Sequence, residues 1–261
     1  MLANLTVTLS DDLSVNRDLE VVVRSAVEEF SRIFPTCPRA GQRPIHVFYD
    51  PQTLWTDCTG DLSVYRIYIK VRDRRYNQLV FQLGHELCHI FADPRRSNWF
   101  VESCCEMASL ELLRRMSRVW ASTPPFPNWV SYAPRFEEYA ENRIRTRTRT
   151  VFGSDSLPGQ AQLREWASTV SESFRDNPTD RPRNVIIAEM LRPLFEESVD
   201  NWDALRFLGE ACTSPPVDLR EVDVNSDFKF ERWLEAVPDH LKDFVRRISE
   251  MFQNRTPHGF E

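Results

Sequence analysis

Hydrophobic positions repeat with two different periods in the first part of the chain, and they predict a small sheet followed by helices. Residues 5–10 and 64–71 alternate between apolar and polar side chains, as half-buried strands do, and residues 44–49 form a short apolar run typical of a buried strand. Asn16 to Phe34 has helical periodicity, and Pro35 and Pro38 are expected to end that helix. Asp50 to Asp61 is expected to be a loop.

From Ala121 onward the pattern predicts helices without strands. Thr123 to Pro127 contains three prolines and is expected to be a stiff linker. The helical segments predicted after it are residues 129–142, 160–174, 185–199 and 228–252. Pro193 is expected to kink the third of these. The apolar stripe of the last segment is interpreted as core.

Composition indicates an ordered globular protein. The 261 residues are 41% hydrophobic and include seven tryptophans, and the formal net charge of −6 argues against nonspecific nucleic-acid binding. No segment approaches the roughly 18 consecutive apolar residues of a membrane span. The N-terminus lacks a basic start followed by an apolar run, so we expect no signal peptide and a cytoplasmic location.

The most informative chemistry is in the pentad HELCH, residues 85–89. Its two histidines are four residues apart, about 1.1 turns of a helix, so His85 and His89 leave the same face and can bind one metal ion. Glu86 lies one position away, where it can take a proton from metal-bound water without being a ligand itself. Apolar residues surround the pentad, which predicts a buried helix whose polar groups need partners.

A catalytic zinc site needs a third protein ligand, with the fourth position left to water. One known spacing places a glycine three residues and a ligand six residues after the second histidine. Here those positions hold Ala92 and Arg95, which excludes that arrangement. Another arrangement takes a glutamate from the following helix.

The next helical segment supplies such a glutamate. The short connection before it contains the breaker Pro94 and the potential capping residues Ser97 and Asn98, which predicts a tight helix–turn–helix. Glu102 and Glu106 are four residues apart and share one helix face. One of them can bind the metal, and the other can accept the ring N–H of a metal-bound histidine.

The two segments HELCHIFAD and WFVESCCEMASLELL together resemble the gluzincin metallopeptidases, HExxH zinc enzymes with a glutamate as third ligand. The resemblance covers about sixty residues. It implies that His85, His89 and Glu102 bind one Zn²⁺ ion per chain, that Glu86 is the general base, and that Glu106 orients a histidine from the second shell.

The resemblance also implies an α+β fold with a zincin-like core, in which a small mixed sheet with an antiparallel edge strand packs on the two zinc-site helices. We expect this metallopeptidase core at residues 1–120, a mainly helical C-terminal lobe at 121–261, and the zinc cleft between them. The expected activity is zinc-dependent hydrolysis of a peptide or protein substrate, with no nucleic-acid or membrane partner.

Two alternatives remain. The chain could be a non-hydrolytic zinc or peptide-binding protein that keeps the zincin fold, although Glu86 is not needed merely to hold zinc. It could also be a regulatory protein in which the helical lobe acts and the zinc is structural, although a structural zinc normally has four protein ligands and only three are evident.

The six cysteines show no metal-binding spacing, and we expect free, buried thiols. Ser103, Cys104 and Cys105 stand where the family usually has Gly-x-Ala. All three are small enough for close helix packing, but the paired thiols could compete for metal or oxidise. Cys88, inside the pentad, is interpreted as a packing residue.

The strand predicted at residues 64–71 has two interpretations. In the family the strand before the zinc helix is the antiparallel edge that borders the cleft, where a substrate peptide can add as a further strand. Its Tyr, Arg and Lys content would equally suit an edge protected against aggregation. Gly84 is unfavourable in a helix and is expected to admit a neighbouring backbone, that of the same sheet.

One basic run, residues 143–150, contains four arginines alternating with other residues. It could bind an anionic partner, but we favour a solvated face that pairs with Glu137, Glu138 and Glu141, because no stacking aromatic or nucleic-acid motif accompanies it. His46 is interpreted as a strand-packing residue. The family resemblance implies an oxyanion-stabilising tyrosine or histidine in the helical lobe, and the unranked candidates are Tyr132, Tyr139 and His240.

Overall fold

The computed structural model describes residues 5–34, 43–170, 174, 177, 179–212, 223 and 227–252. Its strands are β1 (Leu5–Thr8), β2 (Ile45–Tyr49), β3 (Trp55–Asp57) and β4 (Tyr65–Ile69). Its α-helices are α1 (Leu13–Ile33), α2 (Tyr76–Ala92), α3 (Trp99–Ser122), α4 (Ala133–Phe152), α5 (Gln160–Val170), α6 (Arg181–Glu196), α7 (Phe230–Ala236) and α8 (Asp239–Phe252). Two 3₁₀ segments, η2 (Pro127–Tyr132) and η4 (Val199–Phe207), complete the elements. This confirms the α+β class.

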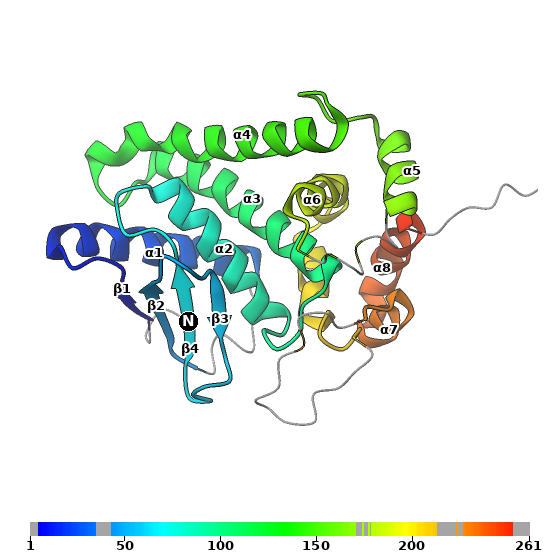
Figure 1. Cartoon of the computed structure of the whole chain (residues 1–261), viewed down its shortest axis with the longest axis horizontal. Helices are drawn as coiled ribbons and strands as arrows, with labels where there is room; N and C mark the ends of the chain where they lie inside the picture. The colour runs from blue at the N-terminus through cyan, green and yellow to red at the C-terminus, as the bar shows by residue number, and fades with distance from the viewer. Residues whose placement is uncertain are drawn as a thin grey trace, which may run out of the picture.

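The sheet has the strand order β1-β2-β4-β3 and lies at one end of the molecule (Figure 1). β1, β2 and β4 are parallel to one another, and β3 is antiparallel to β4. The predicted alternation in residues 5–10 and 64–71 is confirmed, because β1 and β4 bury every second side chain. The sheet is therefore mixed, with one antiparallel edge strand.

The identity of that edge strand corrects the sequence interpretation. β4, the strand predicted at 64–71, lies inside the sheet between β2 and β3, so neither interpretation of it as an edge holds. The edge is β3, which falls within Asp50–Asp61, the segment expected to be a loop. Three residues are too few to show a period of two, and the flanking Asp50, Pro51 and Gly60 are typical of turns.

The helices α2 and α3 form the predicted helix–turn–helix and pack on each other. Asn98 caps α3, because its Oδ1 accepts the backbone N–H groups of Phe100 and Val101, both at 3.0 Å. Gly84 admits a neighbouring backbone as expected, but that backbone is not the sheet. A Cβ at Gly84 would lie 3.1 Å from the Cα of Ser109, a tight contact, so the glycine favours the close approach of α3.

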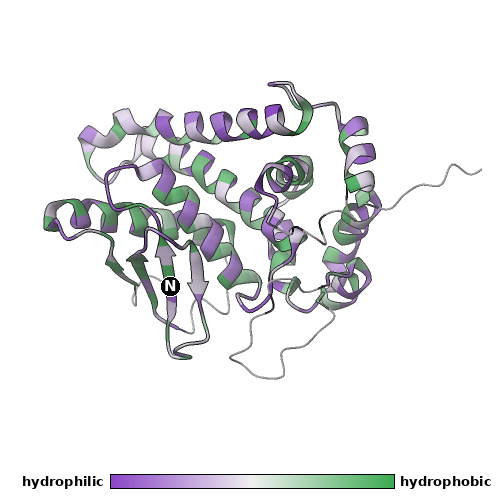
Figure 2. Cartoon of the chain, viewed as in Figure 1, coloured by the Kyte–Doolittle hydropathy of each residue, from purple (hydrophilic) through white to green (hydrophobic). Residues whose placement is uncertain are grey.

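The later helices cover α3 and extend the molecule away from the sheet (Figure 1). α4 continues through the basic run and ends at Gly153, which has a φ of 69°. Pro193 lies inside α6, three residues before its end, and the segment predicted at 228–252 is divided at Pro238 into α7 and α8. Figure 2 shows mainly hydrophilic colours along α4. No helix in the described ranges has the length and apolar character needed to cross a membrane.

One hydrophobic cluster runs through the described part of the chain. It contains residues of the sheet, of α1 to α4 and of the later helices. Phe100 in α3 shows the continuity, because its ring packs on those of Phe230 and Trp233 at centroid distances of 5.1 and 5.4 Å. The core is shared across residue 120, and the division into parts 1–120 and 121–261 stays a prediction.

The expectation of free, buried thiols is confirmed for the cysteines in the described ranges. They are Cys58, Cys88, Cys104, Cys105 and Cys212. Cys37, and the prolines 35 and 38 that were expected to end the first helix, lie outside the described residues.

Candidate metal centre

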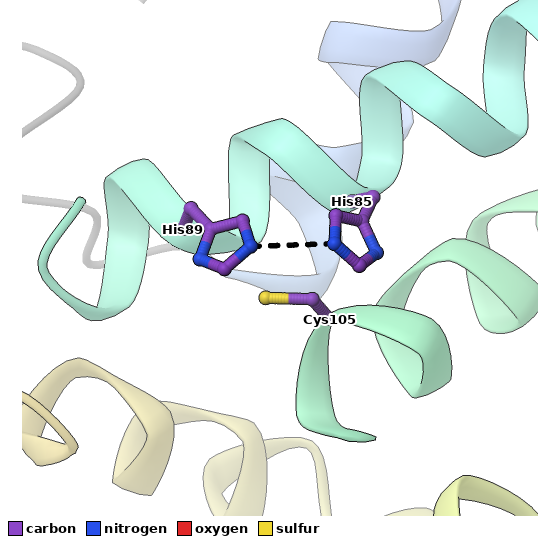
Figure 3. Close-up of side chains that lie close together, drawn as sticks. All are labelled: His85, His89 and Cys105. Atoms are coloured by element: carbon purple, nitrogen blue, oxygen red, sulfur yellow. Dashed lines mark hydrogen bonds between the residues drawn. The ribbon is translucent and has the colours of Figure 1, made fainter. Parts of the chain in front are cut away.

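The two histidines of the pentad face each other on α2. The Nε2 atoms of His85 and His89 are 3.3 Å apart (Figure 3). The His85 side chain is 2% exposed and that of His89 is 12% exposed. The helical spacing of four residues therefore places both rings on one buried face, as the sequence predicted.

The carboxylate of Glu102 on α3 lies against both rings. Its Oε2 is 3.3 Å from His85 Nε2, and its Oε1 is 3.4 Å from His89 Nε2. Ser97, in the turn between the helices, donates its hydroxyl to Glu102 Oε1 at 2.5 Å. The helix–turn–helix thus brings together the three side chains expected to bind zinc, and Ser97 fixes the carboxylate.

These separations fit a single tetrahedral ion. Zinc binds histidine nitrogen and carboxylate oxygen at about 2.0–2.1 Å, so two ligand atoms at the tetrahedral angle are about 3.3 Å apart. The two histidine Nε2 atoms are 3.3 Å apart, and each lies 3.3–3.4 Å from a different oxygen of the Glu102 carboxylate. The histidine pair therefore has the spacing of zinc ligands, and the donor set suits zinc in chemistry.

The electrostatics show how strongly these groups interact. At His89, burial lowers the pKa, but the charge of Glu102 and the hydrogen bond to it outweigh burial and raise the pKa to about 9. At Glu102, burial raises the pKa, but the charge of His89 and the contacts with both rings hold it well below its usual range. Protons and a metal ion would compete for this site.

A thiol that the sequence did not assign to the site also faces the histidines. Cys105 on α3 directs its sulfur towards the two rings, and the ligand atoms of His85, His89 and Cys105 lie within 4.8 Å of one another (Figure 3). Burial raises the pKa of Cys105 well above its ordinary value, which keeps the thiol protonated. The carboxylate of Glu102 is the better third donor, because its contacts are 3.3–3.4 Å and it is charged.

Glu86 is buried but does not join the cluster of ligand atoms. Its Oε2 accepts a hydrogen bond from Thr56 Oγ1 in β3 at 2.9 Å. A pocket of about 170 Å³ is lined by Glu86, His85, His89 and Glu102. Its other lining residues are Leu54, Trp55, Thr56, Pro94, Ser97, Thr179 and Arg181. The expected base and the expected ligands therefore share one pocket.

Glu106 does not occupy the position expected for it. Its carboxylate is bound by Arg143 Nη2, at 3.1 and 3.2 Å from the two oxygens, and by Arg181 Nη1 at 3.1 Å. The buried Nδ1 of His85 has no hydrogen-bond partner among the described residues. The expected contact between Glu106 and a histidine ring is therefore not formed, because two guanidiniums take up the carboxylate.

The basic run is only in part the solvated face that we favoured, because Arg145 and Arg149 are exposed but the ion pairs described for the run do not involve the glutamates of α4. Arg143 turns inward to Glu106, and its guanidinium lies 3.9 Å from the centre of the Phe81 ring. Arg149 pairs with Asp155 beyond the end of α4. These partners lie on other elements, so sequence proximity to the glutamates of α4 did not identify them.

The candidates for oxyanion stabilisation lie outside the pocket lining. They are Tyr132, Tyr139 and His240. Tyr132 Oη accepts the backbone N–H of Asn77 at 3.2 Å, and His240 is exposed on α8. From the later part of the chain, the pocket is lined instead by Thr179, in the turn before α6, and by Arg181, the first residue of α6. His46 lies in β2 against the Phe48 ring, in agreement with its interpretation as a packing residue.

Comparison of the chain with protein-family models, with curated proteins and with solved structures gave no match.

Proposed function

We propose that this chain is a zinc-dependent metallopeptidase with a zincin-like core. One observation carries the proposal: two histidines with the spacing of zinc ligands and a carboxylate in contact with both lie beside a second carboxylate that is not among them, in one pocket. A protein that only holds zinc has no use for Glu86 at that position.

The ligands would be His85, His89 and Glu102, and bound zinc would supply a Lewis acid that polarises the scissile carbonyl and acidifies water. Glu86 takes a proton from the attacking water as its oxygen adds to the carbonyl carbon. It then delivers that proton to the departing nitrogen as the C–N bond breaks. Thr56 holds Oε2 of Glu86 and leaves Oε1 to move the proton.

The edge strand favours a peptide as substrate. β3 is the last strand of the sheet, and Trp55 and Thr56 from it line the pocket together with the preceding Leu54. A peptide lying along this edge can exchange main-chain hydrogen bonds with it while one side chain enters the pocket. The edge of the sheet next to the site is thus available to a peptide, although β3 forms this edge and not the strand expected at residues 64–71.

A second candidate function is supported by Cys105. If its thiol released its proton to solvent and bound the ion as a thiolate, His85, His89, Glu102 and Cys105 would make four protein ligands, as in closed structural sites. The chain would then be a non-hydrolytic zinc or peptide-binding protein. The same four side chains would leave no position for water on the ion.

The substitution Glu86→Gln separates these functions. The peptidase proposal requires that the variant retain about one zinc per chain and lose cleavage of a mixed peptide library, read by mass spectrometry. Glu28→Gln, at an exposed position of α1, is the matched control and should cleave as the unmodified protein does. Equal cleavage by the Glu86 variant would refute the proposed role, and zinc retention without cleavage by any form would favour the closed site.

A further inference from the structure

The pocket lining includes a positive charge that the proposed chemistry does not use. Arg181 is the first residue of α6 and lines the pocket, and its side chain is 35% exposed. We infer that Arg181 binds a carboxylate of the substrate, so that the preferred substrates are peptides with an acidic side chain or a free C-terminal carboxylate near the scissile bond. This inference rests on the proposed peptidase function.

The first support is a charge imbalance. Glu106 is 1% exposed and is the carboxylate shared by Arg143 and Arg181. One negative charge therefore faces two positive charges. Arg143, which is 15% exposed, lies deeper and also stacks on Phe81. Of these two arginines, Arg181 is the one that lines the pocket, so the uncompensated positive charge faces the pocket through Arg181.

The second support is the donor geometry of Arg181. A guanidinium has five N–H donors, and Nη1 of Arg181 donates to Glu106 Oε1 at 3.1 Å. Glu106 is its only acceptor within the described part of the chain. The contact holds the guanidinium in place and leaves Nε and Nη2 to bind the two oxygens of a carboxylate.

The surroundings of Arg181 also favour an anion. Its neighbour Asp180 is engaged with Arg183, whose backbone N–H it accepts at 3.2 Å and whose side chain lies at 3.5 Å. The partial positive charge at the start of α6 adds to that of Arg181. The acidic lining residues, Glu86 and Glu102, belong to the pentad side. A bound Zn²⁺ would offset the charge of these two carboxylates, and Arg181 supplies the positive charge that attracts a substrate carboxylate to the α6 wall.

Binding measurements on the full-length, zinc-loaded Glu86→Gln protein test this inference without cleavage. The probes are four fluorescent hexapeptides with either Glu or Gln at one shared position and either a free or an amidated C-terminus. Each peptide carrying the recognised carboxylate should bind about tenfold to a hundredfold more tightly than its neutral counterpart. Tighter binding of the Glu peptides than of the Gln peptides would show that the site recognises a side-chain carboxylate. Tighter binding of the free-terminus peptides than of the amidated ones would show that it recognises the C-terminal α-carboxylate.

Variants at Arg181 test whether this residue causes the difference in affinity between acidic and neutral peptides. Arg181→Gln should remove the preference and leave the binding of the neutral peptide within about threefold, whereas Arg181→Lys should keep part of it because the charge remains. Arg192→Gln is the matched control, because Arg192 lies on the same helix, pairs with Glu189 and Glu196, and does not line the pocket. Thermal unfolding checks that each variant is folded.

Two results would overturn the inference. One is equal binding of all four peptides by the zinc-loaded Glu86→Gln protein in which Arg181 is unchanged. The other is an equal loss for all four in Arg181→Gln, which would indicate a general role such as oxyanion stabilisation. If the protein with Glu86 intact cleaves none of the peptides but the charge preference is present, the proposed peptidase activity fails and the carboxylate site stands.

Discussion

Thr56 Oγ1 donates a hydrogen bond to Glu86 Oε2 at 2.9 Å and so connects the edge strand β3 with the pentad helix α2. Both side chains are buried, and the contact fixes one carboxylate oxygen of the expected base. A base held in this way can keep its other oxygen directed at a reacting proton. Under the proposed function, this relationship makes β3 part of the chemistry as well as part of the pocket wall.

Replacing Thr56 by valine should therefore reduce turnover without removing metal. Loss of a hydrogen bond to a charged group costs about 1.5–3 kcal/mol, so we expect kcat to fall about tenfold or more. Thr56→Ser should retain most activity, and Thr8→Val, at an exposed position in β1, should change nothing. The measurements are peptide cleavage rate and zinc content by mass spectrometry. An unchanged kcat in Thr56→Val would show that the hydrogen bond does not position the base.

The identity of the third ligand can be tested by comparing Glu102 with Cys105. Glu102→Ala should weaken zinc binding by at least about a hundredfold, as should His89→Ala, because each leaves two protein ligands in place of three. Cys105→Ala should keep zinc within about threefold of the original affinity, like the control Cys104→Ala at the neighbouring buried thiol. Zinc affinity is measured by competition with a chromogenic chelator. Loss of zinc in Cys105→Ala alone would instead identify the thiol as a ligand.

Zinc affinity should depend on pH in a way set by His89. Its pKa is about 9 in the metal-free protein, so the ring is protonated at pH 7 and zinc must displace that proton. Affinity should rise about tenfold per pH unit between pH 6.5 and 8.5, whereas an ordinary histidine with a pKa near 6.5 would level off above pH 7. Calorimetry in buffers of different ionisation heat counts the protons released, and His240→Gln is the control. A plateau above pH 7 would contradict the coupling to Glu102.

Glu106 should matter for stability more than for metal binding. Glu106→Gln leaves Arg143 and Arg181 without their shared carboxylate, and breaking such a buried pair costs about 3 kcal/mol. Zinc affinity should stay within about threefold, since Glu106 touches neither histidine. Urea unfolding measures the free-energy change, and Glu138→Gln, an exposed partner of Arg135, should shift it by less than about 0.5 kcal/mol. A large loss of zinc affinity at unchanged stability would restore the role expected from the sequence.

The contact of Glu102 with His85 and His89 could be predicted because its geometry is local. A four-residue spacing fixes His85 and His89 on one helix face, and a short connection with Pro94 and Asn98 folds the next helix back so that Glu102 reaches them. Helix periodicity and capping act over a few residues. The same information is sufficient to identify both helices from the sequence.

The partners of these groups could not be predicted, because they come from distant segments. Thr56 lies in a strand too short to show periodicity, and its contact with Glu86 depends on how that strand pairs with β4. Arg143 and Arg181 reach Glu106 from two later helices, so neither spacing nor composition pointed to the pair. Cys105 follows Glu102 on the same helix and could have been identified from the i,i+3 spacing alone.

The positions of the pocket residues along the chain also set an order in which the site can be completed during synthesis. The expected ligands lie within residues 85–102 of a helix hairpin, whose contacts are short-range and form early. Thr179 and Arg181 leave the ribosome much later, and α6 must then dock on α3 to place them. If the chain binds zinc and peptides as proposed, a nascent chain can thus capture its metal before it has the wall that selects a substrate. Metal loading and substrate selection would then be separate events in the maturation of this protein.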